Sequence, residues 1–440
     1  MTAVARSRPA IFGHRFSPRA AGAFVLLAAL LAPLLFILAY PLPTVHDDAL
    51  GYLELARNVA AGKGFTQNGL TPMVYRPPLF SALLGGWFFL TGTSSLASAA
   101  IFQSLVHAAG VLAAFLLFLE LAPSVIWAAA GALFLAVNPL LVTRVVFVLQ
   151  EPTLLLFTTL AAYISVRTIK APAAPRAALT GAAWGLCTLA KVVAWFVPFV
   201  LLAMHFLPGR LGRKWRGKEA AAVLVCFTAI IAPWTIRNYV HFQRFIPVNG
   251  QGEGMLEWNV SQAEIPGERP GSEYSVEVYR KGLPEGERKA RLWRYVFDHP
   301  RYFFGYRVLR NVVHFAAPPR DWWIERGLVP PGERRPWFWI LSSLFHIPLY
   351  LLLLLRTRQW WAGRATPALG FIVLLYWAYW AEHAITWGDP RFGLAVYPLL
   401  VGIAIAGTPA NREAALSAAK TPAPGLGTRG VEGEGAQPPG

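Results

Sequence analysis

Charged residues are scarce in this 440-residue chain. Asp, Glu, Lys and Arg together make up only 14% of it, whereas soluble domains contain about 25%. Hydrophobic residues make up 55%, and the mean hydropathy is +0.44. This composition excludes an ordinary soluble enzyme and predicts an all-α polytopic membrane protein, because long apolar helices are needed to cross a bilayer.

Acidic residues are the rarer of the charged residues. The chain has 23 Asp and Glu against 40 Lys and Arg, which gives a formal net charge of +17. A basic protein can bind nucleic acid, but here the basic residues gather in short loops between apolar runs. Basic loops of this kind face the cytoplasm and attract anionic lipids. We therefore expect membrane lipids as partners and no nucleic acid.

Cysteine is almost absent. The two cysteines, Cys187 and Cys226, both lie inside apolar runs. Buried single cysteines behave as small apolar side chains, and their number and spacing fit neither a disulfide framework nor a metal site.

Long apolar runs dominate what is present. The first covers residues 21–40 and follows a basic N-terminus; it is longer than the core of a cleaved signal peptide, so we predict an uncleaved first helix. A run at 77–90 is too short to cross and is typical of an interfacial or re-entrant helix. The other apolar runs predict about ten crossings in total; they cover 94–119, 124–142, 152–166, 177–190, 192–206, 219–234, 337–355, 367–385 and 391–405.

The basic loops set the predicted orientation. With the N-terminus in the cytoplasm, the clusters at 167–176, 210–218 and 356–364 all fall on the cytoplasmic side. The many Ala, Gly, Pro and Arg residues are typical of a GC-rich bacterial genome, so we expect a multi-pass protein of the bacterial inner (plasma) membrane with both termini cytoplasmic.

This orientation also divides the chain. We predict a cytoplasmic tail (1–20), a transmembrane domain (21–407) with periplasmic loops at 41–76 and 237–336, and a disordered tail (408–440) rich in Ala, Gly, Pro and Glu. No internal repeat is evident.

Two adjacent carboxylates, Asp47 and Asp48, follow the first apolar run. Like charges held together at a membrane surface are costly, so such a pair is typical of a base or of a site that binds a cation or a hydroxyl group. The alternative interpretation is the solvated start of a loop. Residues 46–65 then have the pattern of a short amphipathic helix ended by Gly62 and Gly64.

A third acid, Glu151, precedes Pro152 at the start of a later run on the same predicted face. A carboxylate at a helix N-terminus stabilises the helix dipole by up to about 1 kcal/mol, and this structural role is the alternative to a role in the site.

Several cations share the predicted outer face. They are Arg76, Lys191, Arg237 and Arg391, with His383 close to the last of them. Each by itself can contact lipid headgroups, but together they suit the phosphate of a lipid-linked sugar. A carboxylate beside such a phosphate can deprotonate an acceptor hydroxyl, which then attacks the sugar and expels the lipid phosphate.

Five short motifs occur in the order found in the GT-C membrane glycosyltransferases. Between Thr44 and Pro398 the chain resembles glycosyltransferase family 39, which includes protein O-mannosyltransferases, lipid A aminoarabinose transferases and many bacterial mannosyltransferase-like relatives. The matching residues are Asp47, Asp48 and Tyr52 with Gly62-Lys63-Gly64; Arg76-Pro77-Pro78; Glu151-Pro152; Pro233, Trp234, Arg237, Asn238 and Tyr239; and Arg391, Phe392 and Pro398.

The resemblance implies a GT-C-like bundle of about 10–11 helices and an inverting transferase that uses a polyprenyl-phosphate sugar. Asp47 would be the general base, with Asp48 and Glu151 orienting the acceptor or a metal. The substrate-binding residues would be Tyr52, Arg76, Lys191, Arg237, His383 and Arg391. Asp48 departs from the Asp-Glu pair common in protein mannosyltransferases, so the acceptor can be a lipid, a glycan or a protein.

Two questions stay open. Some relatives carry a divalent cation near the acids and others work without one, so the sequence assigns no metal. A transporter or flippase of a lipid-linked glycan is the alternative function, although transporters place their charges near the bilayer midplane and show repeats. An inactive binding subunit is a third interpretation, against which the retained acid pair argues.

Overall fold

The structure is a computed structural model. It describes residues 17–39, 42, 47–205, 217–249, 284–317, 336–386 and 388–407. Their regular secondary structure is helical apart from one two-stranded antiparallel sheet, made of β1 (Thr66–Gln67) and β2 (Thr71–Pro72). The predicted all-α class is therefore confirmed. The predicted tail at 408–440 and most of the tail at 1–20 lie outside the described residues.

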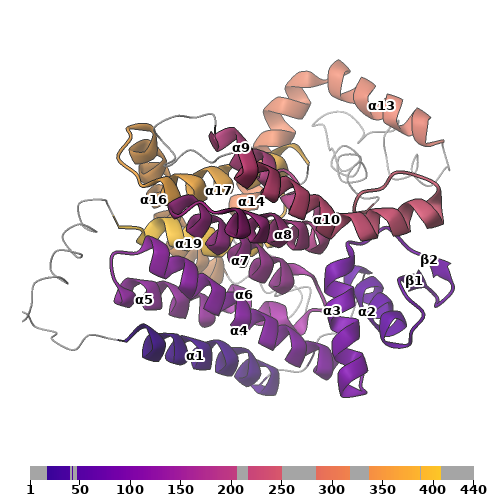
Figure 1. Ribbon diagram of the computed structural model, residues 1–440, viewed down its shortest axis with the longest axis horizontal. Coiled ribbons are helices and arrows are strands. Elements are labelled where there is room, and N and C mark those ends of the chain that lie inside the picture. Colours follow the sequence, from indigo (N-terminus) through magenta and orange to yellow (C-terminus); the bar gives the residue numbers. More distant parts are fainter. Residues whose placement is uncertain are drawn as a thin grey trace, which may run out of the picture.

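A bundle of long helices forms the body of the molecule (Figure 1). Neighbouring helices contact one another in the order α1, α4, α7, α8 and α10, and α5 packs against α1 and α4. Their bounds are Pro18–Ala39 (α1), Leu96–Leu121 (α4), Val125–Ala136 (α5), Glu151–Lys170 (α7), Ala174–Ala190 (α8) and Gly217–Phe242 (α10).

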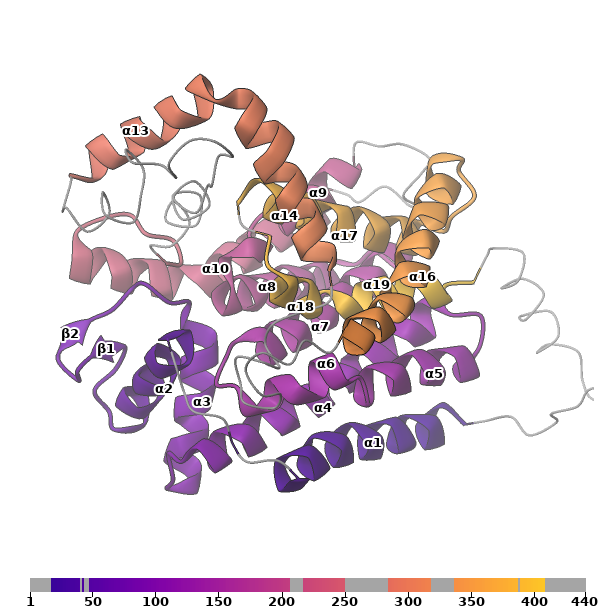
Figure 2. The ribbon, with the colours of Figure 1, turned by 180° about the vertical axis from the view of Figure 1, so that it is seen from behind.

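The C-terminal helices complete the bundle on the side away from α1. Figure 2 shows how the chain descends from α13 through α14 onto α17 and α18. The bounds are Val197–His205 (α9), Glu285–Asp298 (α13), Val308–Ala316 (α14), Pro336–Trp361 (α16), Pro367–Ile385 (α17), Pro390–Ala395 (α18) and Tyr397–Ile405 (α19). Short segments connect helices along the chain. Between α5 and α7 lie α6 (Pro139–Val142) and η1 (Thr143–Val146), between α8 and α9 lies η2 (Val192–Ala194), and between α13 and α14 lies the π-helix η3 (Arg301–Arg307).

Two helices lie at one end of the bundle. They are α2 (Asp47–Ala60) and α3 (Pro78–Thr91), and in Figure 1 α3 stands across the direction of α1 and α4. This agrees with the prediction that the 77–90 run does not cross the membrane. Gly62 and Gly64 follow α2 with φ values of 73° and 68°, a left-handed conformation that glycine adopts without strain and that ends the helix.

Fewer helices are long enough to cross a bilayer than the ten runs predicted. Among the described residues, five helices have the length and hydropathy of membrane spans, and the bent pair at 125–136 and 139–146 makes a sixth. The other predicted crossings include α8, which has 17 residues and a length of about 26 Å against a hydrocarbon thickness of about 30 Å. The runs at 192–206 and 391–405 are broken into shorter helices.

The outer surface of α1 explains why this chain belongs in a membrane. Phe24, Leu27, Leu35 and Leu38 are each more than half exposed. A stripe of large apolar side chains on one helix would be costly in water, whereas lipid is a favourable neighbour for it. Together with the apolar helices, it identifies a multi-pass membrane protein.

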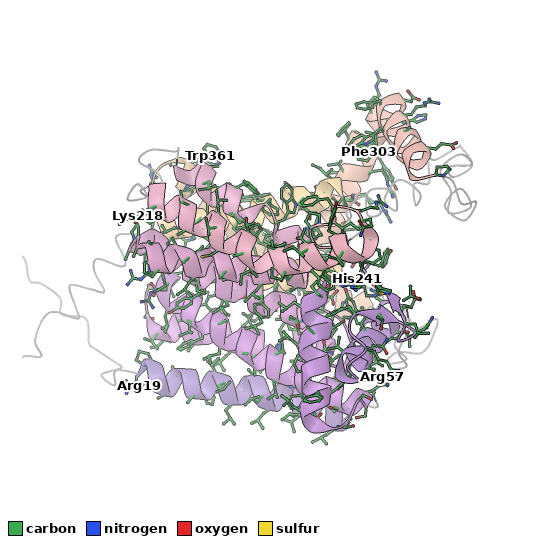
Figure 3. All side chains as sticks on the ribbon, turned by 45° about the vertical axis from the view of Figure 1, so that its right-hand side comes forward. Arg19, Arg57, Lys218, His241, Phe303 and Trp361 are labelled. Atoms are coloured by element: carbon green, nitrogen blue, oxygen red, sulfur yellow. The ribbon has the colours of Figure 1, made fainter. Side chains whose placement is uncertain are left out.

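The two ends of the bundle differ in the residues they carry. In Figure 3, Arg19 and Lys218 lie at one end, while Arg57 and His241 lie at the other. This arrangement agrees with the predicted topology, in which 41–76 and the segment after α10 share a face. Which end faces the cytoplasm stays a prediction.

Helices α8 and α10 approach each other most closely at two glycines. A Cβ added to Gly181 would lie 2.1 Å from the carbonyl oxygen of Val223, and one added to Gly185 would lie 2.8 Å from the Ile230 side chain. Small residues four apart let helix backbones come together in a membrane, where packing rather than the hydrophobic effect drives association. This contact fixes the end of α10 relative to the end of α8.

Candidate functional site

The site begins at the first turn of α2. Asp48 accepts a hydrogen bond through Oδ1 from Arg76 Nη1 at 3.0 Å. The Arg76 guanidinium lies across α2, 4.5 Å from the centre of the Tyr52 ring. Gly51 makes this possible, because a Cβ there would lie 2.6 Å from Arg76 Nε. The predicted acid and the predicted cation are thus paired, with Tyr52 beneath them.

Arg391 reaches the same carboxylate from the C-terminal part of the chain. Its Nη2 donates to Asp48 Oδ2 at 3.2 Å, and its Nε lies 3.8 Å from Glu151 Oε1 and 3.7 Å from Asp389 Oδ2. Asp389 also caps α18, since its Oδ1 accepts from the Arg391 backbone N–H at 2.9 Å. One guanidinium therefore contacts three carboxylates, and Asp48 bridges Arg391 to Arg76.

Glu151 and Lys191 are the buried members of the group. Glu151 begins α7 as predicted and is 5% exposed, while Lys191 follows the last residue of α8 and is 8% exposed. Lys191 Nζ lies 3.0 Å from the centre of the Phe392 ring, a geometry in which the ring stabilises the positive charge. Glu151 Oε2 makes no hydrogen bond with the described residues, so one carboxylate oxygen remains to accept one.

We call five of these residues the outer charge cluster; they are Asp48, Arg76, Glu151, Lys191 and Arg391. Burial and the charges of neighbouring members together determine the protonation states of Asp48, Lys191 and Arg391. Burial opposes ionisation of Asp48, but the positive charges of Arg391 and Arg76 outweigh it and hold its pKa below the ordinary value. Burial lowers the pKa of Lys191 to about 7, although Glu151 opposes this shift. Burial also acts against the charge of Arg391, yet Glu151, Asp389 and Asp48 together raise its pKa.

His383 lies beside the cluster. Its ring centre is 5.3 Å from that of Phe392 and 4.8 Å from that of Phe315. Its Nδ1 is 2.8 Å from the Tyr379 carbonyl oxygen and 2.9 Å from Glu382 Oε2. Both neighbours are acceptors, so Nδ1 carries a proton and donates.

Tyr52 is 3% exposed and packs edge-on against Phe80 at 5.3 Å. Burial raises the pKa of its phenol, and Arg76 only partly opposes this. Tyr52 is therefore a neutral side chain on which Arg76 rests.

Two predicted site residues are not joined to the cluster by any contact within the described part of the chain. Asp47 is the first residue of α2, but its side chain lies outside the described residues, so its role as base stays a prediction. The guanidinium of Arg237 donates to the carbonyl oxygens of Phe65 and Met73, each at 2.8 Å. These carbonyls belong to the loop between α2 and α3.

Sequence analysis missed three residues that hold this site. Asp389 contacts and positions Arg391, and Glu382 pairs with His383. Gln103 is fully buried in α4, and its Nε2 donates to the Val145 carbonyl oxygen at 3.0 Å, in the segment that leads to Glu151. A polar residue in the middle of the apolar run at 94–119 was the available indication.

The described residues contain no group of three or more His, Cys, Asp or Glu side chains that could hold a metal ion. The carboxylates of the cluster are instead bound by guanidinium groups. A divalent cation near Asp47 stays untested.

Comparison with known proteins places the fold. No protein-family model matches the chain, and no curated protein matches it significantly in sequence. The solved structures do match. An archaeal oligosaccharyltransferase, AglB from Archaeoglobus fulgidus, in complex with an inhibitory peptide and a dolichol-phosphate, superposes with a TM-score of 0.52 at 14% identity, over 88% of this chain and 50% of that one.

Two further structures were found. An Archaeoglobus fulgidus oligosaccharyltransferase tethered to an acceptor peptide has a TM-score of 0.50 at 15% identity, over 90% of this chain and 53% of that one. ArnT from Cupriavidus metallidurans, bound to undecaprenyl phosphate, has a TM-score of 0.43 at 14% identity, over 88% of this chain and 76% of that one.

The two oligosaccharyltransferase matches define the fold. The chain has the GT-C fold of membrane glycosyltransferases, as the sequence predicted. It spans about half the length of the two oligosaccharyltransferase chains, so what those whole proteins do is not transferred with the fold.

Proposed function

We propose that the protein is a membrane glycosyltransferase that moves a sugar from a polyprenyl-phosphate-linked donor to an acceptor at the outer end of the bundle, on the periplasmic face of a bacterial inner membrane. The observation that supports this most is the outer charge cluster. Five separate segments of the chain bring Asp48, Arg76, Glu151, Lys191 and Arg391 together at the end where α2 and α3 lie.

Arg76, Arg391 and Lys191 would bind the donor phosphate. A guanidinium has five N–H donors in a fixed plane, and Asp48 takes one from each arginine. The remaining donors suit phosphate oxygens, which Arg binds in a bidentate manner. Lys191 adds a compact charge that the proximity of the phosphate would keep protonated, because a nearby anion raises a lysine pKa.

Asp47 would act as general base. It removes the proton from the acceptor hydroxyl while the hydroxyl oxygen bonds to the anomeric carbon of the sugar. The bond from that carbon to the phosphate oxygen breaks, and the polyprenyl phosphate leaves with the electron pair. One displacement inverts the anomeric carbon, and the cations stabilise the charge that develops on the phosphate.

Asp48 and Glu151 would have different duties from Asp47. Asp48 is committed to two arginines and remains ionised, so it orients cations rather than accepting a proton. Glu151 is buried and keeps one free oxygen, which suits a hydrogen bond from an acceptor or sugar hydroxyl. His383 would position Phe392, and Tyr52 would support Arg76.

The test is transfer from a defined donor. Purified wild-type protein in lipid nanodiscs is incubated with radiolabelled polyprenyl-phosphate sugars and a total membrane-lipid and glycan extract as acceptor. We expect sugar transfer or donor hydrolysis that Asp47→Asn abolishes. The matched control is Glu54→Gln, since Glu54 lies on the same helix and a glutamine oxygen can still accept the hydrogen bond that Glu54 accepts from the Asn68 backbone.

The alternative function has its own outcome in this experiment. A transporter or flippase would leave every donor intact. In vesicles made from the same lipids, it would move a fluorescent lipid-linked glycan across the bilayer. Intact donor with both wild type and Asp47→Asn would contradict the transferase.

A further inference from the structure

The C-terminal part of α10 holds the loop that leads to Arg76. Arg237 Nη2 donates to the Phe65 carbonyl oxygen and Nη1 to the Met73 carbonyl oxygen. The two acceptors face each other across the base of the β1–β2 hairpin, because the Met73 N–H donates to the same Phe65 oxygen at 3.0 Å. One guanidinium therefore closes the hairpin and attaches it to α10.

Aromatic contacts strengthen this attachment. Trp234 lies one turn before Arg237, and its ring meets Phe65 edge-on at 4.9 Å. The Arg237 guanidinium lies 4.7 Å from the centre of the same indole ring. Both ends of the guanidinium and one of its faces are thus occupied by the protein itself.

A second bond fixes the chain directly before Arg76. Asn249 Nδ2 donates to the Tyr75 carbonyl oxygen at 3.3 Å. Asn249 lies in the segment after α10 that Asn238 and Thr235 bind through the carbonyl oxygens of Ile246 and Pro247. The backbone is therefore held at Met73, three residues before Arg76, and at Tyr75, which directly precedes it.

Position matters at Arg76 because its contacts are exacting. The side chain must cross Gly51, rest on Tyr52 and donate to Asp48. A shift of about 1 Å in a positioning element can reduce a rate by about 100-fold. A short two-stranded hairpin such as β1–β2 is only marginally stable by itself, so contacts from outside the loop are needed to hold Arg76 in such a position.

We propose that Arg237 is a positioning residue for Arg76 and does not bind the donor. It holds the base of the hairpin so that Arg76 reaches Asp48. Three of its five N–H donors already bind neutral acceptors, namely the carbonyl oxygens of Phe65 and Met73 and the side-chain oxygen of Asn238. This inference deepens the proposed function and rests on it only where transfer rates are concerned.

The position of the hairpin can be measured without any activity. Leu70 lies at the hairpin tip and is 84% exposed, and Ile101 lies on α4 and is 42% exposed, so both accept a nitroxide label through cysteine. The label distance is measured by pulsed electron paramagnetic resonance in a background that lacks Cys187 and Cys226. We expect a distribution at least about twofold broader in Arg237→Gln than in the parent, because the base of the hairpin loses its attachment to α10.

The matched control is Arg57→Gln. Arg57 also uses its guanidinium to bind a loop carbonyl, that of Ser94 at 3.1 Å, but it is not attached to the hairpin. Its loss should leave the 70–101 distribution unchanged. An unchanged distribution in Arg237→Gln as well would overturn the proposal.

Kinetics then separate positioning from binding. If Arg237 acts through Arg76, Arg237→Gln should lower kcat by about 10- to 100-fold with little change in the donor KM. The same substitution should cost less than about threefold when Arg76→Gln is already present, since residues that act in series are not additive. Arg237→Lys should rescue little, because an ammonium cannot bridge two carbonyls as a guanidinium does.

The opposite kinetic results would contradict the positioning role of Arg237. Penalties that multiply in the double variant, with a raised donor KM and rescue by lysine, would make Arg237 a phosphate ligand. If no variant or wild type transfers sugar, the proposed function fails, while the label distances still decide whether Arg237 positions the loop.

Discussion

At the scale of single residues, Asp48 is the centre of the site. Its two oxygens bind two arginines that come from opposite parts of the chain. The sequence predicted a chemical role for Asp47 and a supporting one for Asp48, and both roles stay predictions. A carboxylate that holds two cations cannot easily accept a proton as well.

Substitution of Asp48 tests its role as organiser. Asp48→Asn keeps the shape but loses the charge, so Arg76 and Arg391 lose the anion that holds them together. We expect kcat/KM for the donor to fall on the order of 100-fold, as for other misplaced positioning groups, with folding preserved as judged by gel filtration. Activity equal to that of Glu54→Gln would show that the two arginines do not need this bridge.

Lys191 predicts a pH dependence. Its pKa is lowered by burial to about 7, so in the free protein it is charged below pH 7 and neutral above it. If it binds the donor phosphate, the donor Kd should rise as pH increases from 6 to 8, by up to about tenfold per pH unit above the pKa. Isothermal titration with a polyprenyl phosphate measures this.

Lys191→Arg provides the comparison for that titration. A guanidinium stays charged over this whole range, so the variant's affinity should not vary with pH between 6 and 8. A pH profile identical to that of wild type would assign the dependence to another group.

At the scale of helices, the close packing of α8 against α10 determines where Lys191 and Arg237 are placed. Lys191 follows the end of α8, and Arg237 lies near the end of α10. The glycines at 181 and 185 determine how these ends sit relative to each other. Packing in the middle of the bundle therefore influences residues at the end that carries α2.

Gly181→Ala should separate these helices. The new Cβ would lie 2.1 Å from the Val223 carbonyl oxygen, a backbone atom that cannot move alone. We expect a loss of about 1–3 kcal/mol in stability, as for other overpacked contacts, seen as a lower thermal midpoint in detergent. Gly86→Ala on α3 is the control, since a Cβ there meets nothing within 4 Å.

At the scale of the whole molecule, the arrangement of the ends predicts a labelling pattern. Cysteine placed at Arg57 or His241 should react with an impermeant maleimide in intact cells, because both lie at the end that carries α2 (Figure 3). Cysteine at Lys218 should react only after the membrane is broken. Reaction of Lys218→Cys in intact cells would reverse the proposed orientation.

How much of this could be predicted depends on what kind of interaction fixes each part. Apolar runs and basic loops predicted the helical bundle and gathered Asp48, Arg76, Glu151, Lys191 and Arg391 on one face, because membrane topology is encoded locally. The starts of α3 and α7 followed from Pro77, Pro78 and Pro152.

The remainder depends on tertiary contacts. Arg237 binds backbone carbonyl groups that are far away in sequence. Every residue has such a carbonyl group, so the order of side chains does not show which of them Arg237 binds. The turn that presents Arg391 requires Gly388, because a Cβ there would lie 2.1 Å from the Asn311 carbonyl oxygen. Nor does hydropathy show where a run breaks, as at 192–206 and 391–405.

The bridge at Asp48 also has a consequence for biosynthesis. Arg391 lies 343 residues after Asp48, and a ribosome adds about 5–20 residues per second. Asp48 and Arg76 must therefore wait at the membrane for tens of seconds before Arg391 is translated. Of the two arginines that Asp48 contacts, only Arg76 is present during that interval, so premature termination anywhere upstream of α18 should leave an inserted protein in which the outer charge cluster is incomplete.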